Sequence, residues 1–189
     1  MTTIYFVRHA EPNYENHDDR SRELTAKGMA DSERVARFLA DKGVQVAVSS
    51  PYRRAVDTIR RLAEASGLEI LLEEDFRERE AGGWIEDFES FDAFRARQWA
   101  DFDYRLPGGE SLREVQSRNV EALERLLGEH GGKTIVVATH GIALSMMINH
   151  YDARFGFMEF ERIKNIMPWI VRLTFEGDVL TGIEELPLP

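Results

Sequence analysis

Near the start of the chain stands the stretch Ile4-Tyr5-Phe6-Val7-Arg8-His9-Ala10-Glu11, which decides how the rest is interpreted. Residues 4–7 are an apolar run, which is typical of a strand buried inside a sheet. An Arg-His pair directly after such a strand is costly inside a core but useful at its edge. In open α/β sheets, ligands bind just beyond the carboxyl ends of the strands. We therefore expect Arg8 and His9 to lie at the mouth of a site.

The chain repeats this arrangement near its other end. Residues 134–138 form a second apolar run, and Thr139-His140-Gly141 follows it. If these two strands share one parallel sheet, His9 and His140 meet at the same edge. Two histidines beside an arginine suggest chemistry on a phosphate group, with one histidine as the nucleophile.

Helices alternate with strands along the rest of the chain. Ser50, with Pro51 after it, is a candidate helix N-cap, and Ser111 with Glu114 resembles a capping box. This alternation predicts an α/β fold, a three-layer α/β/α sandwich around a mainly parallel central sheet, in one domain spanning residues 1–189. The expected helices follow Thr25 to about Lys42, follow Ser50 to about Ala65, and span 86–103, 111–130 and 141–150; the expected strands span 4–7, 44–48, 68–72, 134–138, 169–175 and 179–183.

Composition narrows the class of protein. The 189 residues, of which 43% are hydrophobic, suffice for one full core. No apolar run is long enough to span a bilayer, and Arg8 and His9 interrupt the first one, so we expect neither a membrane partner nor a signal peptide. The absence of cysteine excludes disulfides and thiolate metal sites. These features predict a cytoplasmic protein.

The charge pattern points to a small anionic partner. A net charge of −10 argues against nucleic-acid binding. An acidic protein with a local arginine pocket can still bind a small anion, so we expect a small-molecule phosphate ester as partner and a monomer or homodimer as the assembly. No histidine pair has metal-ligand spacing, so no metal or other cofactor is expected. The arginines near the suspected site are Arg8, Arg53, Arg54, Arg77 and Arg79.

Six ordered motifs together resemble those of the histidine phosphatase superfamily, which has the phosphoglycerate mutase-like fold. The resemblance covers nearly the whole chain and implies that Arg54, rather than Arg53, is the catalytic arginine of its motif. The motifs are Arg8-His9-Ala10-Glu11, Leu24-Thr25-Ala26-Lys27-Gly28, Ser50-Pro51-Tyr52-Arg53-Arg54-Ala55, Glu78-Arg79-Glu80-Ala81-Gly82-Gly83-Trp84, Pro107-Gly108-Gly109-Glu110-Ser111 and His140-Gly141.

The resemblance implies a metal-independent, two-step displacement through a phosphohistidine. Neutral His9 attacks phosphorus, and its other ring nitrogen donates to a backbone carbonyl. Arg8, Arg54 and a protonated His140 hold the phosphate oxygens.

The resemblance implies roles for two further groups around the phosphate. The N-terminus of the helix that begins at Gly141 adds backbone donors to it. Glu78 protonates the leaving oxygen and then activates water.

Other residues near the motifs are candidates for substrate contact. Asn13 and Asn16 lie near the position at which the family often has a phosphate-binding asparagine, without its usual spacing. His17 lies in the loop that follows Arg8-His9 and could reach the mouth of the site. Segment 85–106 is either a lid that sets the substrate, a helix packed on the core, or a dimer contact. Its helical face carries Phe88, Phe91, Phe94 or Arg95, Trp99 and Phe102.

Several activities remain compatible with these residues. The stretch from Glu78 to His140 is short for the family's mutases, which favours a phosphatase acting on a small phosphorylated metabolite. A phosphoglycerate mutase-type phosphotransferase, a protein phosphatase and a non-catalytic phosphoprotein-binding module are the alternatives. The presence of both His9 and Glu78 argues against the last of these.

Overall fold

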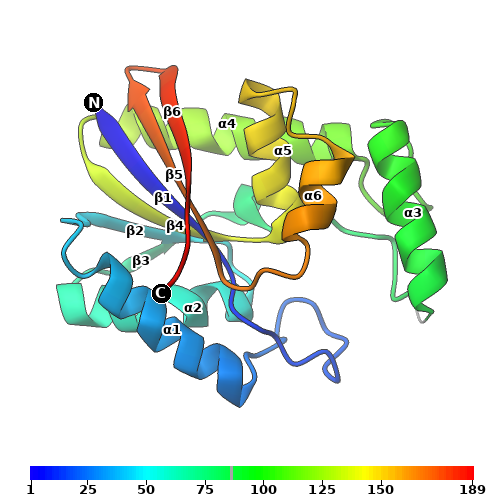
Figure 1. Cartoon of the computed structure of the whole chain (residues 1–189), viewed down its shortest axis with the longest axis horizontal. Coiled ribbons are helices and arrows are strands. Elements are labelled where there is room, and N and C mark those ends of the chain that lie inside the picture. Colours follow the sequence, from blue (N-terminus) through cyan, green and yellow to red (C-terminus); the bar gives the residue numbers. More distant parts are fainter. Residues whose placement is uncertain (86) are drawn as a thin grey trace.

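The computed structural model describes residues 1–85 and 87–189, and six strands within them form one sheet of order β3-β2-β4-β1-β5-β6 (Figure 1). Strands β3, β2, β4 and β1 are parallel to one another, whereas β5 pairs antiparallel with β1 and β6 pairs antiparallel with β5. The expectation of a mainly parallel central sheet is therefore confirmed. The strands are β1 (Thr2–Arg8), β2 (Val46–Ser49), β3 (Ile70–Leu72), β4 (Thr134–Thr139), β5 (Trp169–Glu176) and β6 (Val179–Leu186).

Helices cover both faces of this sheet, with α1 and α2 on one face and α4 and α5 on the other (Figure 1). The alternation of side chains along β1 explains both layers. Tyr5 and Val7 belong to the apolar cluster with α1 and α2, and Ile4 and Phe6 to the cluster with α4 and α5. The helices are α1 (Ala26–Leu39), α2 (Arg53–Ser66), α3 (Phe88–Ala100), α4 (Leu112–His130), α5 (Gly141–Tyr151) and α6 (Phe157–Ile163), with a 3-10 turn η1 (Glu74–Phe76).

Helix caps agree with the sequence in two places and differ in one. The backbone N–H of Glu114 donates to the Ser111 hydroxyl at 3.2 Å, and the Glu114 carboxylate accepts from the Ser111 N–H, so the capping box is confirmed. Thr25 likewise caps α1. The expectation for Ser50 was wrong, because Tyr52 is the N-cap of α2. The hydroxyl of Ser50 lies against a histidine instead.

Helix α3 lies at one end of the molecule, beyond α6 and away from the sheet (Figure 1). The expected helix over 86–103 is shorter, ending at Ala100; Glu86 and the side chain of Phe88 lie outside what is described. Trp99 and Phe94 are buried, and the Trp99 ring lies 5.6 Å from that of Phe160 on α6. Helix α3 is therefore held to the rest of the protein through side chains.

One remaining difference concerns a short helix. Helix α6 was not predicted, because its seven residues are too few for a clear periodic pattern. In the described part of the chain, no helix has the length and apolar character needed to cross a membrane.

Candidate active site

Strands β1 and β4 bring the two histidines together. They are parallel neighbours in which Arg8 pairs with Thr139, so the residue after each strand is a histidine at the same edge. The backbone N–H of His9 donates to the carbonyl oxygen of Thr139 at 3.0 Å. The centroids of the His9 and His140 rings lie 5.3 Å apart, and both residues are buried. The pairing expected from the two apolar runs is thus present.

The ring of His9 is fixed by its own backbone neighbour. Nδ1 lies 2.8 Å from the carbonyl oxygen of Ala10, so it donates and leaves the lone pair on Nε2. Burial, with Arg54 and Arg8 nearby, holds the pKa of His9 well below its usual value. The imidazole is therefore neutral at physiological pH, with its nucleophilic nitrogen identified.

His140 is held by the hydroxyl that was expected to cap a helix. Its Nε2 lies 2.7 Å from Ser50 Oγ, and the Tyr52 ring packs edge-on at a centroid distance of 5.0 Å. Burial, followed by the charge of Arg54, lowers the pKa of His140 well below its usual value. In the protein alone the ring is therefore neutral, and its protonation beside a bound phosphate stays a prediction. A phosphate dianion beside the ring would favour the protonated form.

Two buried arginines flank the histidines. Nη1 of Arg8 donates to the carbonyl oxygens of Ile163 and Ile166 at 3.0 and 3.2 Å, while its Nε has no partner among the described residues. Arg54 donates to the Asp19 carbonyl oxygen at 2.6 Å and pairs with the Asp19 carboxylate. Arg53, by contrast, is exposed and pairs with Asp57. Of this adjacent pair, only Arg54 reaches the site.

The carboxylate of Glu78 sits on the N-terminus of α5. Its two oxygens accept from the backbone N–H groups of Ile142 and Ala143, each at 3.1 Å, and one also accepts from the N–H of Arg79. Helix N-termini favour anions in this way. These two N–H groups were expected to face the phosphate, but Glu78 occupies them. The N-terminus of α5 thus positions two groups: His140 is its N-cap, and its first turn binds the candidate general acid, Glu78.

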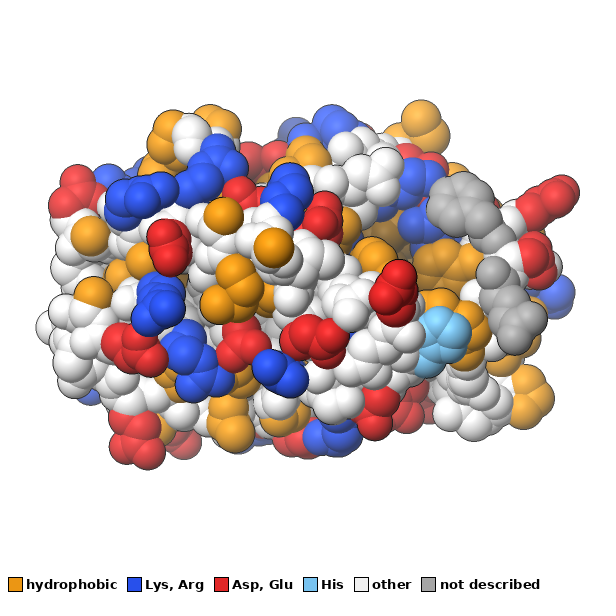
Figure 2. Space-filling view, turned by 90° about the horizontal axis from the view of Figure 1, so that it is seen from below, with side chains coloured by type: hydrophobic (Ala, Val, Ile, Leu, Met, Phe, Trp, Pro, Cys, Tyr) orange, Lys and Arg blue, Asp and Glu red, His pale blue; other side chains and the backbone are white. Residues whose placement is uncertain are grey.

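A cavity of about 540 Å³ opens in front of these side chains. In Figure 2, a hollow toward the end that carries α3 shows basic and hydrophobic side chains inside it. Four cationic side chains besides Arg8 and Arg54 line this cavity, and of these only Arg79 was named among the arginines expected near the site: Arg22, Arg79, Arg95 and Lys164. The other lining residues include Arg8, His9, Tyr14, Asp19, Arg54, Glu78, Trp84, Ile85, Phe91, Gly141, Ile142, Phe160 and Met167.

The remaining candidates lie around this cavity rather than in it. Asn13 and Asn16 both donate their side-chain amides to the carboxylate of Glu23, at 2.7 and 3.0 Å, so the structure does not bring them to the histidines. The His17 ring stacks on the Trp84 ring at 3.9 Å. Because Trp84 lines the cavity, His17 backs its wall without lining it. Arg77, also expected near the site, instead pairs with Glu110 at 2.9 Å.

One residue without a sequence signal positions the loop that carries Glu78. Arg118 of α4 donates to the carbonyl oxygens of Asp75, Arg77 and Glu78 at 2.7, 2.8 and 3.1 Å. The same guanidinium forms two hydrogen bonds of 2.8 Å with the Glu110 carboxylate. Nothing in the local pattern around Arg118 separates it from an ordinary surface arginine. Only the packing of α4 against η1 reveals its role.

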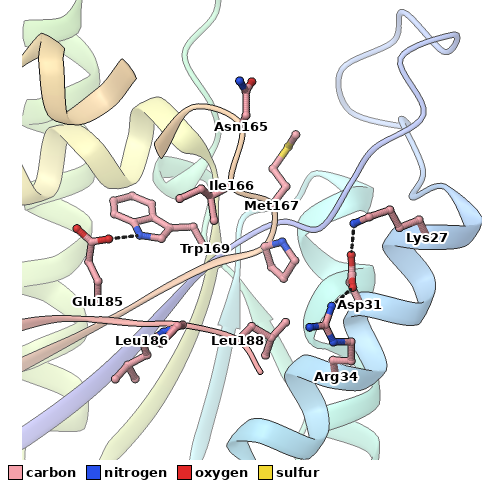
Figure 3. A pocket seen from close by; sticks show the side chains of 12 residues that line it. Lys27, Asp31, Arg34, Asn165, Ile166, Met167, Trp169, Glu185, Leu186 and Leu188 are labelled. Atoms are coloured by element: carbon pink, nitrogen blue, oxygen red, sulfur yellow. Dashed lines mark hydrogen bonds and ion pairs between the residues drawn. The ribbon is translucent and has the colours of Figure 1, made fainter. Parts of the chain in front are cut away.

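A second cavity, of about 470 Å³, lies between α1 and the segments around β5 and β6 (Figure 3). Its charged side chains satisfy one another. Asp31 pairs with Lys27 and with Arg34 at 2.5 and 2.7 Å, and Glu185 accepts from the Trp169 ring N–H at 3.2 Å. Among the described residues, both of its cations are therefore paired with Asp31, whereas Arg8 and Arg79 in the first cavity form no ion pair. No cluster of three metal-ligating side chains occurs among the residues described.

Comparison with known proteins gives a consistent family. The sequence matches the family model described as histidine phosphatase superfamily (branch 1) over residues 4–181. It is 33% identical to phosphoglycerate mutase-like protein 4 of Arabidopsis thaliana, covering 94% of this chain and 82% of that protein. It is 28% identical to phosphoserine phosphatase 1 of Hydrogenobacter thermophilus, covering 78% of this chain and 74% of that protein.

Solved structures agree on the fold. YhfR of Bacillus stearothermophilus superposes with a TM-score of 0.80 at 21% identity, covering 96% of this chain and 95% of that one. Phosphoserine phosphatase of Entamoeba histolytica, in complex with phosphoserine, gives a TM-score of 0.79 at 23% identity, with 97% and 96% covered. The phosphoglycerate mutase-like fold expected from the motifs is confirmed.

Proposed function

Because the chain belongs to the histidine phosphatase superfamily (branch 1), we propose that it is a phosphomonoester hydrolase with His9 as its nucleophile. The orientation of His9 carries this proposal. Its Nδ1 is held by the Ala10 carbonyl oxygen, so Nε2 is the nitrogen free to attack. The same cavity is lined by Arg8, Arg54 and Glu78. A neutral, oriented imidazole among fixed cations is suited to in-line attack on a phosphate monoester.

The first step transfers the phosphoryl group to the protein. The lone pair of Nε2 attacks phosphorus, and the bond between phosphorus and the ester oxygen breaks. Glu78, in its protonated form, gives a proton to that departing oxygen. Arg8 and Arg54 hold the equatorial oxygens, on which charge gathers in the transition state. The products of this step are the free alcohol and a phosphohistidine.

The second step returns the enzyme to its starting state. The Glu78 carboxylate takes a proton from water, and the water oxygen attacks phosphorus. The bond between phosphorus and Nε2 breaks, which releases inorganic phosphate and neutral His9. His140 takes up a proton from solvent when the phosphate dianion binds, contributes charge to the same oxygens in both steps, and gives the proton back to solvent when inorganic phosphate leaves. Arginine and histidine thus supply the positive charge that both steps use.

A small phosphorylated metabolite is the proposed substrate. The phosphoserine phosphatase among the relatives supports a small phosphate ester by analogy. A mutase is the second candidate, since the relative from Arabidopsis carries a mutase-like name. A mutase must keep water from its phosphohistidine, and the short stretch from Glu78 to His140 leaves little chain for a cover. Hydrolysis is therefore favoured.

Metal-free phosphate release tests the proposal. The wild type, His9→Ala and His150→Ala are compared on an aryl phosphate and a panel of phosphorylated metabolites. His150 is an exposed histidine on α5 and serves as the matched control. We expect release by the wild type and the control, and none by His9→Ala. Retained turnover in His9→Ala would reject His9 as nucleophile. Conversion of 3-phosphoglycerate to its 2-isomer, without phosphate release, would establish the mutase instead.

A further inference from the structure

Arg79 is a buried cation without an anionic partner in the described residues. Its exposed fraction is 6%, and its side chain lines the cavity. Within residues 1–85 and 87–189, its one side-chain hydrogen bond is to the neutral amide oxygen of Gln98, at 2.7 Å, and its Nε has no partner. Gln98 is itself fixed by donating to the carbonyl oxygens of Tyr104 and Glu110. A buried charge normally has a counter-charge, so this guanidinium requires an explanation.

Arg95 of α3 lies close to Arg79 on the same side of the cavity. The guanidinium carbons of Arg79 and Arg95 lie 5.7 and 5.1 Å from the centroid of the Phe91 ring. Arg95 is 8% exposed; it pairs with the carboxylate of Asp92 and lies 3.9 Å from that of Glu161, while its Nε lacks a partner among the described residues. Burial is the main cause that lowers the pKa of Arg79; the charge of Glu78 opposes this shift and that of Arg95 adds to it. Mutual repulsion of this kind is relieved when an anion binds between the two charges.

The surroundings of Arg79, beside the partly paired Arg95, resemble an anion-binding site. Aromatic rings flank both guanidinium groups: Phe94 lies 4.8 Å from that of Arg79, and Phe160 lies 5.7 Å from that of Arg95. Such stacking fixes the planes of arginine side chains and leaves their edges to form hydrogen bonds. Carboxylate and phosphate groups match those edges with paired hydrogen bonds. The second cavity, whose charges are all paired within the described residues, shows no such arrangement.

We propose that Arg79 and Arg95 form a second anion subsite, which binds a carboxylate or phosphate on the leaving group of the substrate. This inference rests on the proposed function, because Glu78 then marks the side of the phosphorus from which the leaving group departs. The side chains of Arg79 and Glu78 line the same cavity, so we assign Arg79 to that side. Arg8 and Arg54 hold the phosphate that is transferred, and Arg79 and Arg95 hold the second anion. The substrate class is a compact phosphate ester with two anionic groups.

Matched pairs of ligands test this subsite without turnover. His9→Ala protein cannot form the phosphohistidine, so dissociation constants are measured on it by titration calorimetry. The carboxylate pair is 3-phosphoglycerate and glycerol 3-phosphate, and the phosphate pair is fructose 1,6-bisphosphate and fructose 6-phosphate. In one pair, we expect the ligand with the second anionic group to bind at least about tenfold more tightly than its partner, because it gains one charge-assisted contact. The pair that shows this preference identifies the second anion.

Variants then assign the preference to the two arginines. Arg79→Gln and Arg95→Gln, each made in the His9→Ala background, should reduce the affinity ratio within that pair by about tenfold. Arg79→Lys should retain part of it, because the charge remains while the paired hydrogen bonds are lost. Arg97→Gln is the matched control, since Arg97 is exposed on the same helix and stacks on Tyr104, at 4.0 Å. Thermal unfolding shows which variants fold. If only one of the two glutamine variants folds, its affinity ratio alone is enough to test the subsite.

The outcomes separate this inference from the proposed function. Equal affinity within both pairs, or an affinity ratio that survives both glutamine substitutions, would overturn the subsite. Neither result depends on catalysis. Aryl phosphate hydrolysis that requires His9 would leave the proposed function intact in that case. A tenfold preference that falls in the arginine variants but not in Arg97→Gln would establish the subsite, whichever reaction the enzyme performs.

Discussion

The hydroxyl of Ser50 lies 2.7 Å from Nε2 of His140, so a serine at the end of β2 orients a histidine at the end of β4. The other ring nitrogen of His140 has no protein partner in the described part of the chain. Ser50 is therefore the group that fixes the orientation of the ring. The hydrogen bond joins two neighbouring strands of the sheet at the edge where the site lies.

Ser50→Ala should lower kcat/KM about 10- to 100-fold, because His140 loses its orientation toward the phosphate oxygens. The measurement is steady-state kinetics with an aryl phosphate, with the folded state checked by thermal unfolding. Ser49→Ala is the control, since the buried Ser49 hydroxyl donates to a backbone carbonyl and contacts neither histidine. Wild-type kcat/KM in Ser50→Ala would remove Ser50 from the positioning of His140.

Stability should depend on pH through the two buried histidines. The pKa values of His9 and His140 in the folded protein lie well below the usual value, chiefly because of burial. In the unfolded chain both titrate near about pH 6.5. Below that pH the unfolded state takes up protons that the folded state does not, so the free energy of unfolding falls as pH falls. Each histidine should contribute a slope of about 1.4 kcal/mol per pH unit.

Urea unfolding at about pH 7 and about pH 5.5 measures this slope around the unfolded-state pKa of histidine. His140→Asn should show a shallower decline than the wild type, and the exposed His150→Asn should match the wild type. An identical pH dependence in His140→Asn and the wild type would contradict the assignment of His140 as a buried, neutral ring.

Glu78→Gln should affect substrates according to how much their leaving groups need a proton. Alkyl phosphates leave as poor alkoxides, so their kcat should fall about 100-fold or more when the general acid is removed. Aryl phosphates need little protonation and should lose much less in the first step. Glu80→Gln, at an exposed neighbouring carboxylate, is the control. Equal losses on alkyl and aryl phosphates would argue against Glu78 as the general acid.

Arg118→Gln should both destabilise the protein and slow the reaction. The change removes one of the two arginines that pair with the half-buried Glu110, leaving Arg77, and frees the carbonyl oxygens of Asp75, Arg77 and Glu78. We expect a loss of about 2–4 kcal/mol in the free energy of unfolding.

The control for this substitution lies on the same helix. Arg113 forms an exposed ion pair with Asp103, at 2.5 Å, and its removal should cost less than about 1 kcal/mol. The two variants are compared by urea unfolding and by kcat on one substrate. If Arg118→Gln and Arg113→Gln have the same effect, Arg118 does not hold the Glu78 loop.

Gly141→Ala should weaken phosphate binding, because a Cβ there would lie 3.1 Å from the guanidinium carbon of Arg8. Arg8 would have to shift, and the inhibition constant of inorganic phosphate should rise about three- to tenfold. Gly128→Ala, on α4 with open space around it, is the control. An unchanged inhibition constant for Gly141→Ala would show that Arg8 adapts without loss.

The sequence predicted the parts of the site that depend on strand ends. The apolar runs before Arg8 and before His140 are local patterns, and parallel pairing of their strands follows from the α/β alternation. The family resemblance also predicted that a backbone carbonyl would hold one ring nitrogen of His9, and the Ala10 carbonyl oxygen does so.

The sequence could not predict hydrogen bonds for which two groups compete, because the outcome depends on how distant segments pack. Ser50 has the sequence of a helix cap, but the nearby His140 takes its hydroxyl, and Tyr52 becomes the N-cap. The N–H groups at the start of α5 are a generic anion site, and only the folded loop shows that Glu78 fills them. Arg118 and the burial of Arg79 likewise depend on contacts between segments distant in sequence.

Helix α3 stands apart from the sheet that presents His9 and His140 (Figure 1). The reactive groups therefore depend on backbone pairing between strands, whereas the helix that carries Arg95 depends on side-chain contacts at its borders. A fold divided in this way is modular: residues 85–106 can be exchanged or redesigned to accept another leaving group while the phosphoryl-transfer machinery keeps its geometry. For an engineer, this helix is the interchangeable part of the enzyme.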